Sequence, residues 1–244
     1  MPKNVEKMST IYSPNFDARK RSKKNIKYLI FHYTGMKSDK SAIHKLTSFN
    51  SKVSCHYYID KKGNLIRLVP DLYVAWHVGK SFWKKDKLLN YNSIGIEISN
   101  PGHEHGYKAF NNKQIKCLIK ISKKLIKKYK INAKNILGHS DVAPLRKKDP
   151  GEKFPWKFIS SKKIGIWHNL NFKKSNKLRG QKINIDNKIF FRKLKKFGYF
   201  TNTSKKNEFK KIIINFQRRF RPELIDGKVD RESFEILKTL ISNN

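Results

Sequence analysis

The segment with the most chemical promise is 138–151, which reads GHSDVAPLRKKDPG. It carries His139 and Asp149, ten positions apart on a stretch rich in proline. A further histidine, His32, ends an apolar run. Two histidines and one carboxylate are a typical ligand set for catalytic zinc, which keeps a fourth position for water. Such an ion lowers the pKa of the bound water to about 7 and polarises a carbonyl group. The spacing alone does not require His32 to meet the other two residues.

The flanking segments predict the elements that would bring these residues together. Residues 26–33 (IKYLIFHY) are apolar and β-rich, which predicts a buried strand ending at a histidine. The run 93–99 (SIGIEIS) predicts another strand, in which Gly95 allows close backbone approach. The other predictions are a short helix at 41–48, strands at 55–60 and 65–69 joined by a turn at 61–64, an amphipathic helix at 112–130 and a loop at 138–155.

The two ends of the chain have a different character. Residues 1–24 look like a polar arm, and residues 168–184 form a polar stretch suited to a linker. Three short helices are predicted beyond this stretch, at 189–197, 209–220 and 231–240, separated by Gly198-Tyr199 and Asp226-Gly227. A segment of about 60 residues is enough for a small second domain.

The composition is strongly basic. Lys and Arg number 56 and Asp and Glu 18, which gives a formal net charge of +38 over 244 residues. The 38% of hydrophobic residues suffice for a core and exclude collagen-like and fully disordered chains. The charge would suit a nucleic acid, an anionic membrane surface or an acidic polymer. However, 46 of the basic residues are Lys. Lys, Asn and Ile all have A/T-rich codons, so drift in base composition explains the excess equally well.

Nothing in the sequence predicts export or membrane insertion. No run of about 18 apolar residues is present, and the basic N-terminus lacks the apolar segment of a signal peptide. We therefore expect a cytoplasmic protein, with a periplasmic or cell-envelope location by a less obvious route as the alternative. Two cysteines, Cys55 and Cys117, are too few for a disulfide framework and are expected to be reduced.

Six ordered motifs resemble the type 2 N-acetylmuramoyl-L-alanine amidases, the AmiD/AmpD-like zinc amidases related to peptidoglycan recognition proteins. The resemblance extends from about residue 26 to residue 158. The motifs are FHYT at 31–34, SCHY at 54–57, GNLIRLVP at 63–70, AWHVG at 75–79, NSIGIE at 92–97 and the 138–151 segment. The implied fold is of the α/β class, with a central mixed β-sheet flanked by helices and the zinc ion at one edge of a cleft.

Transferred position by position, the resemblance assigns the zinc ligands to His32, His139 and Asp149. All three are present, whereas the binding-only relatives of the family lack ligands. The catalytic glutamate falls on Glu97 and the catalytic lysine on Lys147. Amide hydrolysis needs a water nucleophile, a base that takes its proton and a cation that faces the developing oxyanion. The expectation is one zinc ion, Glu97 as base and proton shuttle, and Lys147 as oxyanion stabiliser.

Four further residues are predicted to bind substrate. Trp76 offers a flat face for a sugar or peptide, and His77 offers a polar group in the cleft, although a satisfied pair in the core is nearly as good an interpretation. Arg146 and Lys52 could pair with carboxylates of a stem peptide. Asp141 is expected to orient a ligand histidine, as carboxylates commonly do at zinc sites.

Other polar residues are expected to be structural. His56 matches a family position but is predicted to support the fold or the site rather than to react. The sequence His103-Glu104-His105 looks like a metal cluster, yet such a loop beside proline and glycine is more often a solvated turn. Cys55 is interpreted as a small buried residue.

The C-terminal helices resemble, more weakly, the helical peptidoglycan-binding domain. The matching pieces are KLKKFGY at 193–199, FQRRF at 216–220 and DGKVDRE at 226–232. The alternative is a helical extension that only packs on the catalytic domain. The predicted organisation is a polar arm at 1–24, a zinc amidase domain at 25–168, a linker at 169–184 and a small all-α three-helix domain at 185–244.

The resemblance implies a bacterial zinc hydrolase that cleaves the amide between the lactyl group of N-acetylmuramic acid and L-alanine. Peptidoglycan or muropeptides would be its substrate, in turnover or recycling of the cell wall, and we expect a monomer. The alternative is a non-catalytic peptidoglycan-binding protein of the same fold. A charge-driven nucleic-acid-binding protein is a third possibility, but no helix-turn-helix, zinc-finger or RNP-like motif supports it.

Overall fold

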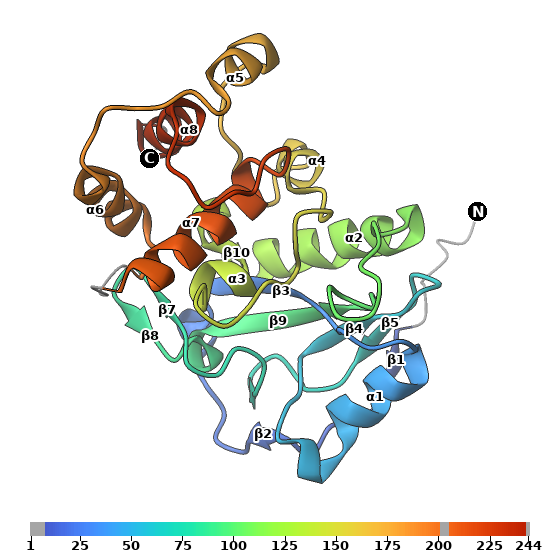
Figure 1. The fold of residues 1–244 in the computed structure, drawn as a ribbon. Helices are drawn as coiled ribbons and strands as arrows, with labels where there is room; N and C mark the ends of the chain where they lie inside the picture. Colours follow the sequence, from blue (N-terminus) through green and yellow to red (C-terminus); the bar gives the residue numbers. More distant parts are fainter. Residues whose placement is uncertain (1–7, 201–204, 243–244) are drawn as a thin grey trace.

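A six-stranded mixed β-sheet carries the fold in the computed structural model, which describes residues 8–200 and 205–242 (Figure 1). In sheet order the strands are β1 (Ser9–Thr10), β5 (Leu65–Arg67), β4 (Tyr57–Ile59), β9 (Ser93–Ile98), β3 (Tyr28–Tyr33) and β10 (Ile136–Gly138). β4, β9, β3 and β10 run parallel, whereas β5 is antiparallel to β4. The predicted α/β class with a mixed central sheet is therefore confirmed.

The described ranges contain eight α-helices. They are α1 (Asp39–Thr47), α2 (Asn112–Tyr129), α3 (His139–Val142), α4 (Trp156–Ser161), α5 (Phe172–Leu178), α6 (Asn187–Phe197), α7 (Lys206–Phe220) and α8 (Arg231–Ser242). None of these helices is long and apolar enough to cross a membrane. Three helices fall where none was predicted: α3 lies within the expected loop at 138–155, α4 follows directly after that loop, and α5 lies within the expected linker.

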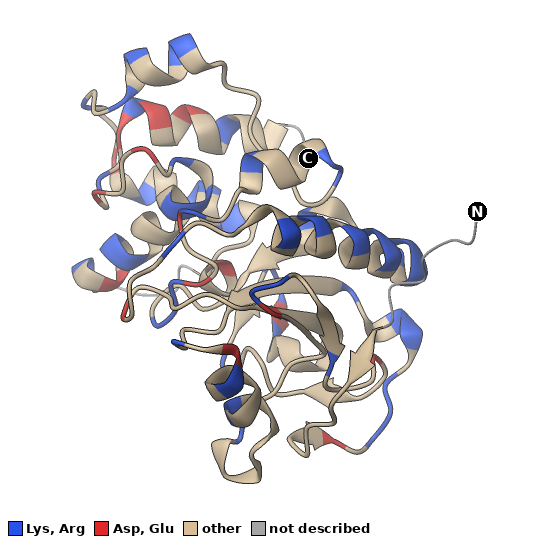
Figure 2. Cartoon of the chain, turned by 90° about the vertical axis from the view of Figure 1, so that its right-hand side faces the viewer, with Lys and Arg blue, Asp and Glu red and all other residues tan. Residues whose placement is uncertain are grey.

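Basic side chains are spread over the surface rather than gathered at one site. Figure 2 shows Lys and Arg mainly on the helices and loops, including the long helix α2 beside the N label, whereas the central strands carry almost none. All seven lysines of α2 are exposed, while its apolar residues are turned inward. This distribution agrees with a solvated outer face for much of the positive charge.

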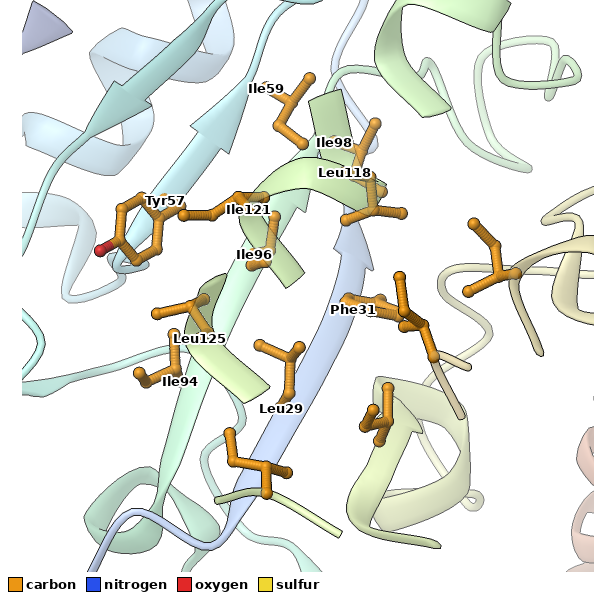
Figure 3. Close-up of a cluster of buried hydrophobic side chains, with 14 of the residues drawn as sticks. Leu29, Phe31, Tyr57, Ile59, Ile94, Ile96, Ile98, Leu118, Ile121 and Leu125 are labelled. Atoms are coloured by element: carbon orange, nitrogen blue, oxygen red, sulfur yellow. The ribbon is translucent and has the colours of Figure 1, made fainter. Parts of the chain in front are cut away.

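The side chains of β3 point alternately into two hydrophobic cores, one on each face of the sheet. Leu29 and Phe31 lie on the side of the sheet that α2 covers, and Figure 3 shows them with residues of β9 and β4 beneath that helix. Tyr28 and Ile30 belong to the cluster on the opposite side. Because successive side chains of a strand point to opposite faces, His32 lies on the side of Tyr28 and Ile30.

The second core is shared with the C-terminal helices. One buried cluster contains Tyr28, Ile30 and Trp83 together with the apolar residues of α6, α7 and α8. Gly198 lies so close to Trp83 that an added Cβ would be 2.6 Å from the indole ring. The Gly198 carbonyl also accepts a hydrogen bond from the backbone N–H of Lys84 at 2.8 Å. The C-terminal helices are therefore joined to the sheet domain by a shared hydrophobic core, in addition to the connecting segment.

The described part of the predicted polar arm packs onto the sheet domain. β1 joins the sheet edge beside β5, and β2 (Phe16–Asp17) pairs with β6 (Val74–Ala75). Arg21 is buried, and its Nη2 donates to the carbonyl oxygen of Asp71 at 2.9 Å. The sequence predicted a polar arm, and the structure buries part of it, where backbone carbonyl groups accept hydrogen bonds from Asn15 and Arg21. Residues 1–7 of the predicted arm lie outside the described residues.

Candidate active site

Three adjacent parallel strands deliver polar side chains to one edge of the sheet. On β3 and β9, His32 is in register with Glu97. On β10, Gly138 is in register with Phe31, so the next residue, His139, comes to lie beside His32. The carboxyl ends of parallel strands are the usual place for a ligand site in an α/β sheet. The pairing of β10 with β3 thus brings His139 beside His32, which could not be deduced from their spacing in the sequence.

The three predicted metal ligands form a compact triangle. The distances between His32 Nδ1, His139 Nδ1 and Asp149 Oδ2 are each 3.0 Å. All three residues are buried, and they are the one group of at least three His, Cys, Asp or Glu side chains in the described ranges that could hold a metal ion. The backbone fixes Asp149, because its carbonyl accepts from the N–H of Ser140 on α3 at 2.8 Å.

The proton positions in the triangle fit a bound cation. His139 Nε2 lies 3.2 Å from the carbonyl oxygen of Val78, which can only accept, so Nε2 carries the proton and Nδ1 a lone pair. The carboxylate of Asp149 is also an acceptor, so two acceptor atoms face each other. Two ligand atoms of a tetrahedral zinc ion with bonds of about 2.0–2.1 Å lie about 3.3 Å apart. The donor atoms and their separation therefore fit zinc with one open position.

The surroundings of His32 and Asp149 keep both ligands in their metal-binding forms. Burial, together with the neighbouring His139, lowers the pKa of His32 to about 4. Burial opposes ionisation of Asp149, but the facing His139 and His32 hold the pKa of this carboxyl well below its usual range. Neutral imidazole and ionised carboxylate are the forms that bind metal.

Glu97 lines the same cleft from β9. Burial raises the pKa of Glu97 well above its usual range, the Asp149 carboxylate adds to this rise, and the Lys147 ammonium opposes it. Its Oε2 is buried and has no hydrogen-bond partner among the residues with assigned structure. A carboxyl group with a raised pKa and an unengaged oxygen is suited to exchange a proton with a reacting group.

The loop that precedes Asp149 carries two further predicted residues into the cleft. The carbonyl of Lys147 accepts from Asn215 Nδ2 on α7 at 3.1 Å, which fixes the loop from the C-terminal side. The guanidinium of Arg146 donates to the carbonyl oxygens of Lys80, at 2.8 Å, and Val78. Lys147 is half-buried and Arg146 is exposed, and both residues line the cleft.

An open cleft of about 320 Å³ lies over the triangle. Among the residues that line it are Tyr33, Lys45, Trp76, His77, Glu97, His103, His139, Arg146, Lys147, Lys148 and Asp149. Trp76 is half-buried, and its indole N–H donates to Asp17 Oδ1 at 2.7 Å. Lys52 is not among the lining residues. Its Nζ instead lies 3.8 Å from the centroid of the exposed Phe49 ring.

The prediction that Asp141 orients a ligand histidine was wrong. Its Oδ1 accepts from the Tyr199 hydroxyl at 2.5 Å. Its Oδ2 accepts from the N–H of Gly138 at 2.7 Å and from Arg219. Both oxygens are therefore engaged in joining the start of α3 to the C-terminal helices.

His103 is packed in the cleft wall rather than solvated as predicted. Its Nδ1 accepts from the Tyr33 hydroxyl at 2.8 Å, and its Nε2 donates to the Glu152 carboxylate at 3.1 Å. The ring stacks on Tyr107 with 4.4 Å between centroids. Glu152 accepts in addition from Arg218 Nε on α7 at 3.0 Å. No local signal in the sequence predicts the two hydrogen bonds, because Tyr33 and Glu152 lie 70 and 49 positions away along the chain.

Comparison with known proteins identifies close relatives of this arrangement. Residues 22–152 match a family model described as N-acetylmuramoyl-L-alanine amidase (Amidase_2). The chain is 33% identical over 232 residues to N-acetylmuramoyl-L-alanine amidase AmiD of Escherichia coli K12, over 88% of this chain and 82% of the relative. The structure of E. coli AmiD with anhydro-N-acetylmuramic acid-L-Ala-D-γ-Glu-L-Lys has a TM-score of 0.80 and 32% identity over 90% of each chain. Pseudomonas aeruginosa AmpDh3 in complex with anhydromuramic pentapeptide gives a TM-score of 0.79 and 28% identity over 97% of this chain and 99% of the other.

Proposed function

Because the chain belongs to the N-acetylmuramoyl-L-alanine amidase family (Amidase_2), we propose that it uses one zinc ion to hydrolyse the amide between the lactyl group of N-acetylmuramic acid and L-alanine. The resemblance drawn from the motifs is confirmed over nearly the whole chain. The observation that carries the proposal is the triangle of His32, His139 and Asp149 at the floor of an open cleft. Three protein ligands and an open position are typical of catalytic zinc.

We infer that anhydro-muropeptides are a substrate class. Two of the related structures hold an anhydro-muropeptide, and the present chain covers each of them over 90% of its length or more. The cleft is lined by Lys45, Arg146 and Lys148, whose charges suit the carboxylates of a stem peptide. The half-buried ring of Trp76 provides a flat surface against which a sugar can pack.

The residues of the cleft have separate roles in the proposed reaction. A zinc ion, when bound, acts as a Lewis acid on the scissile carbonyl and lowers the pKa of water. Glu97 takes a proton from the attacking water and returns it to the amide nitrogen as the C–N bond breaks. The ammonium of Lys147 stabilises the negative charge on the former carbonyl oxygen. The products are a lactyl carboxylate and a peptide with L-alanine at its new amino terminus.

The experiment uses purified full-length protein that is stripped with a chelator and then reconstituted with zinc. Soluble anhydro-muropeptide and intact sacculi are supplied in parallel, and released peptides are identified by mass spectrometry. We expect peptides beginning with L-alanine from the reconstituted protein and none from the stripped protein. Binding of either substrate without any release by the reconstituted protein would instead identify a non-catalytic peptidoglycan-binding protein.

A further inference from the structure

A chain of hydrogen bonds leads from the ligand histidine of β3 into the interior. His32 Nε2 lies 3.0 Å from His77 Nδ1, and His77 Nε2 lies 3.0 Å from Ser93 Oγ. The Ser93 hydroxyl in turn lies 2.5 Å from the carbonyl oxygen of Leu89. All three side chains are buried, with exposed fractions of 1% for His32, 8% for His77 and 0% for Ser93. Solvent therefore contributes little to the arrangement of protons along this chain.

The Leu89 carbonyl, at the end of this series of hydrogen bonds, determines the direction of each of them. The Leu89 carbonyl can only accept, so the Ser93 hydroxyl donates its single proton there. Ser93 Oγ then accepts from His77, which places the His77 proton on Nε2 and a lone pair on Nδ1. His77 Nδ1 accepts in turn from His32 Nε2. The lone pair of His32 consequently lies on Nδ1, the atom that faces Asp149 in the triangle.

The position of the His77 ring is closely constrained. A Cβ at Gly95 would lie 2.4 Å from His77 Nδ1, so the ring occupies the space that only glycine leaves free on β9. The side-chain oxygen of Asn90 accepts from the backbone N–H groups of His77, at 3.1 Å, and Val78, at 2.9 Å. Gly95, expected to permit close backbone approach, thus permits close approach of an imidazole ring.

We propose that Ser93 and His77 are positioning residues that fix the tautomer of His32, so that its Nδ1 is ready to accept a metal ion. The opposite tautomer would put a proton on Nδ1, inside the triangle, and remove one of the three ligand atoms. The inference rests on the proposed function for the identity of the ion but not for the substrate or the reaction. It also gives His77 a role other than the substrate contact that the sequence suggested.

The first test is Ser93→Ala, which removes the acceptor of the His77 Nε2 proton. We expect the zinc affinity of this variant to fall by about 10–100-fold, as is usual when a partner of a ligand histidine is lost. Competition with a chromophoric chelator, without substrate, measures this affinity. Ser122→Ala removes another fully buried hydroxyl, on α2, and is expected to bind zinc like the wild type. Unchanged affinity in folded Ser93→Ala would overturn the inference. Zinc-loaded wild type without amidase activity would overturn only the proposed function.

A second pair of variants separates hydrogen bonding from packing. The amide oxygen of His77→Asn can accept from His32 Nε2, whereas His77→Leu fills space but accepts nothing. We expect the Asn variant to retain most of the zinc affinity and the Leu variant to lose about 10–100-fold. Nitrogen-15 NMR of the metal-free protein should show the His32 proton on Nε2 in the wild type and on Nδ1 in His77→Leu. Equal affinities of the two variants, or the same His32 tautomer in His77→Leu as in the wild type, would contradict the inference.

Discussion

Arg219 on α7 and Asp141 on α3 form a buried ion pair between the C-terminal helices and the corner of the chain that carries a metal ligand. Asp141 follows His139 by two positions, and Tyr199 donates to the same carboxylate. The backbone N–H of Gly138, the last residue of β10, is held by it as well. The C-terminal helices therefore contribute directly to the placement of His139, in addition to covering the second core.

Removing one partner of the Arg219–Asp141 pair should destabilise the folded protein. Arg219→Met leaves the Asp141 carboxylate buried without its cation, and we expect the free energy of unfolding to fall by about 3–5 kcal/mol in urea denaturation. Adding Asp141→Asn should recover part of the loss, because no buried charge then remains unpaired. The surface pair of exposed Lys238 with half-buried Glu235 on α8 is the control, and its removal should cost less than about 1 kcal/mol. Similar losses at both pairs would count against a burial effect.

The proposed base can be separated from the metal ligands. Glu97→Gln retains the shape of the side chain but cannot take a proton from water. We expect zinc affinity to be unchanged and kcat to fall by about 10²–10⁴-fold, with little change in KM. Steady-state rates on an anhydro-muropeptide measure the effect, with Glu235→Gln on α8 as the control. A Glu97→Gln enzyme with the wild-type kcat would show that the base is another group.

Asp149→Asn should remove the metal while preserving the fold. A neutral amide is a poor zinc ligand, so we expect the variant to lose both bound zinc and activity. The amide NH2 of the introduced asparagine can donate to the lone pair on His139 Nδ1, so the melting temperature of the metal-free protein should not change. Elemental analysis and thermal denaturation measure the two properties. Asp60→Asn, at an exposed turn, is the control that should retain zinc. Zinc retained by Asp149→Asn at the wild-type level would exclude Asp149 as a ligand.

His168 gives a dependence of stability on pH that is separate from the metal site. It is half-buried and donates to the carbonyl of Phe220 at 3.1 Å, and this partial burial lowers its pKa from 6.5 to about 4. Between these two values the unfolded chain binds a proton that the folded chain does not, so stability falls as the pH is lowered from 6.5 to 4. His168→Gln keeps a donor but does not titrate. We expect a shallower decline in this window, measured by urea denaturation at successive pH values, and identical slopes would contradict the assignment.

The regular elements could be predicted because their signals are local, and the ligand set because the motifs resemble those of a known family. The apolar run at 26–33 corresponds to β3, and the helical period at 112–130 corresponds to α2. The motifs around His32 and His139 selected residues that the parallel strands do bring together. The roles of Glu97 and Lys147 stay predictions until their variants are assayed.

The missed features depend on partners that are distant in the sequence. Asp141 lies 78 positions from Arg219, and nothing near either residue indicates the pairing. Arg21 sits in a polar segment, yet it is buried because backbone carbonyl groups surround it. His103 was interpreted from its neighbours in the chain, whereas Tyr33 and Glu152 determine its environment. A residue type indicates what a side chain can bind but not which group the fold places beside it.

The core shared by the sheet and the C-terminal helices has a consequence for biosynthesis. Ribosomes deliver the N-terminal part first, at about 5–20 residues per second. The sheet face that includes Tyr28, Ile30 and Trp83 is therefore made before residues 190–240, which cover it. Between the synthesis of Trp83 and that of residue 240, about 8–31 s at this rate, the nascent chain exposes this apolar surface, and for part of that time it lacks Arg219 beside Asp141. We expect chains stalled within this interval to be sensitive to protease and to recruit chaperones, and zinc loading to follow release of the last helix.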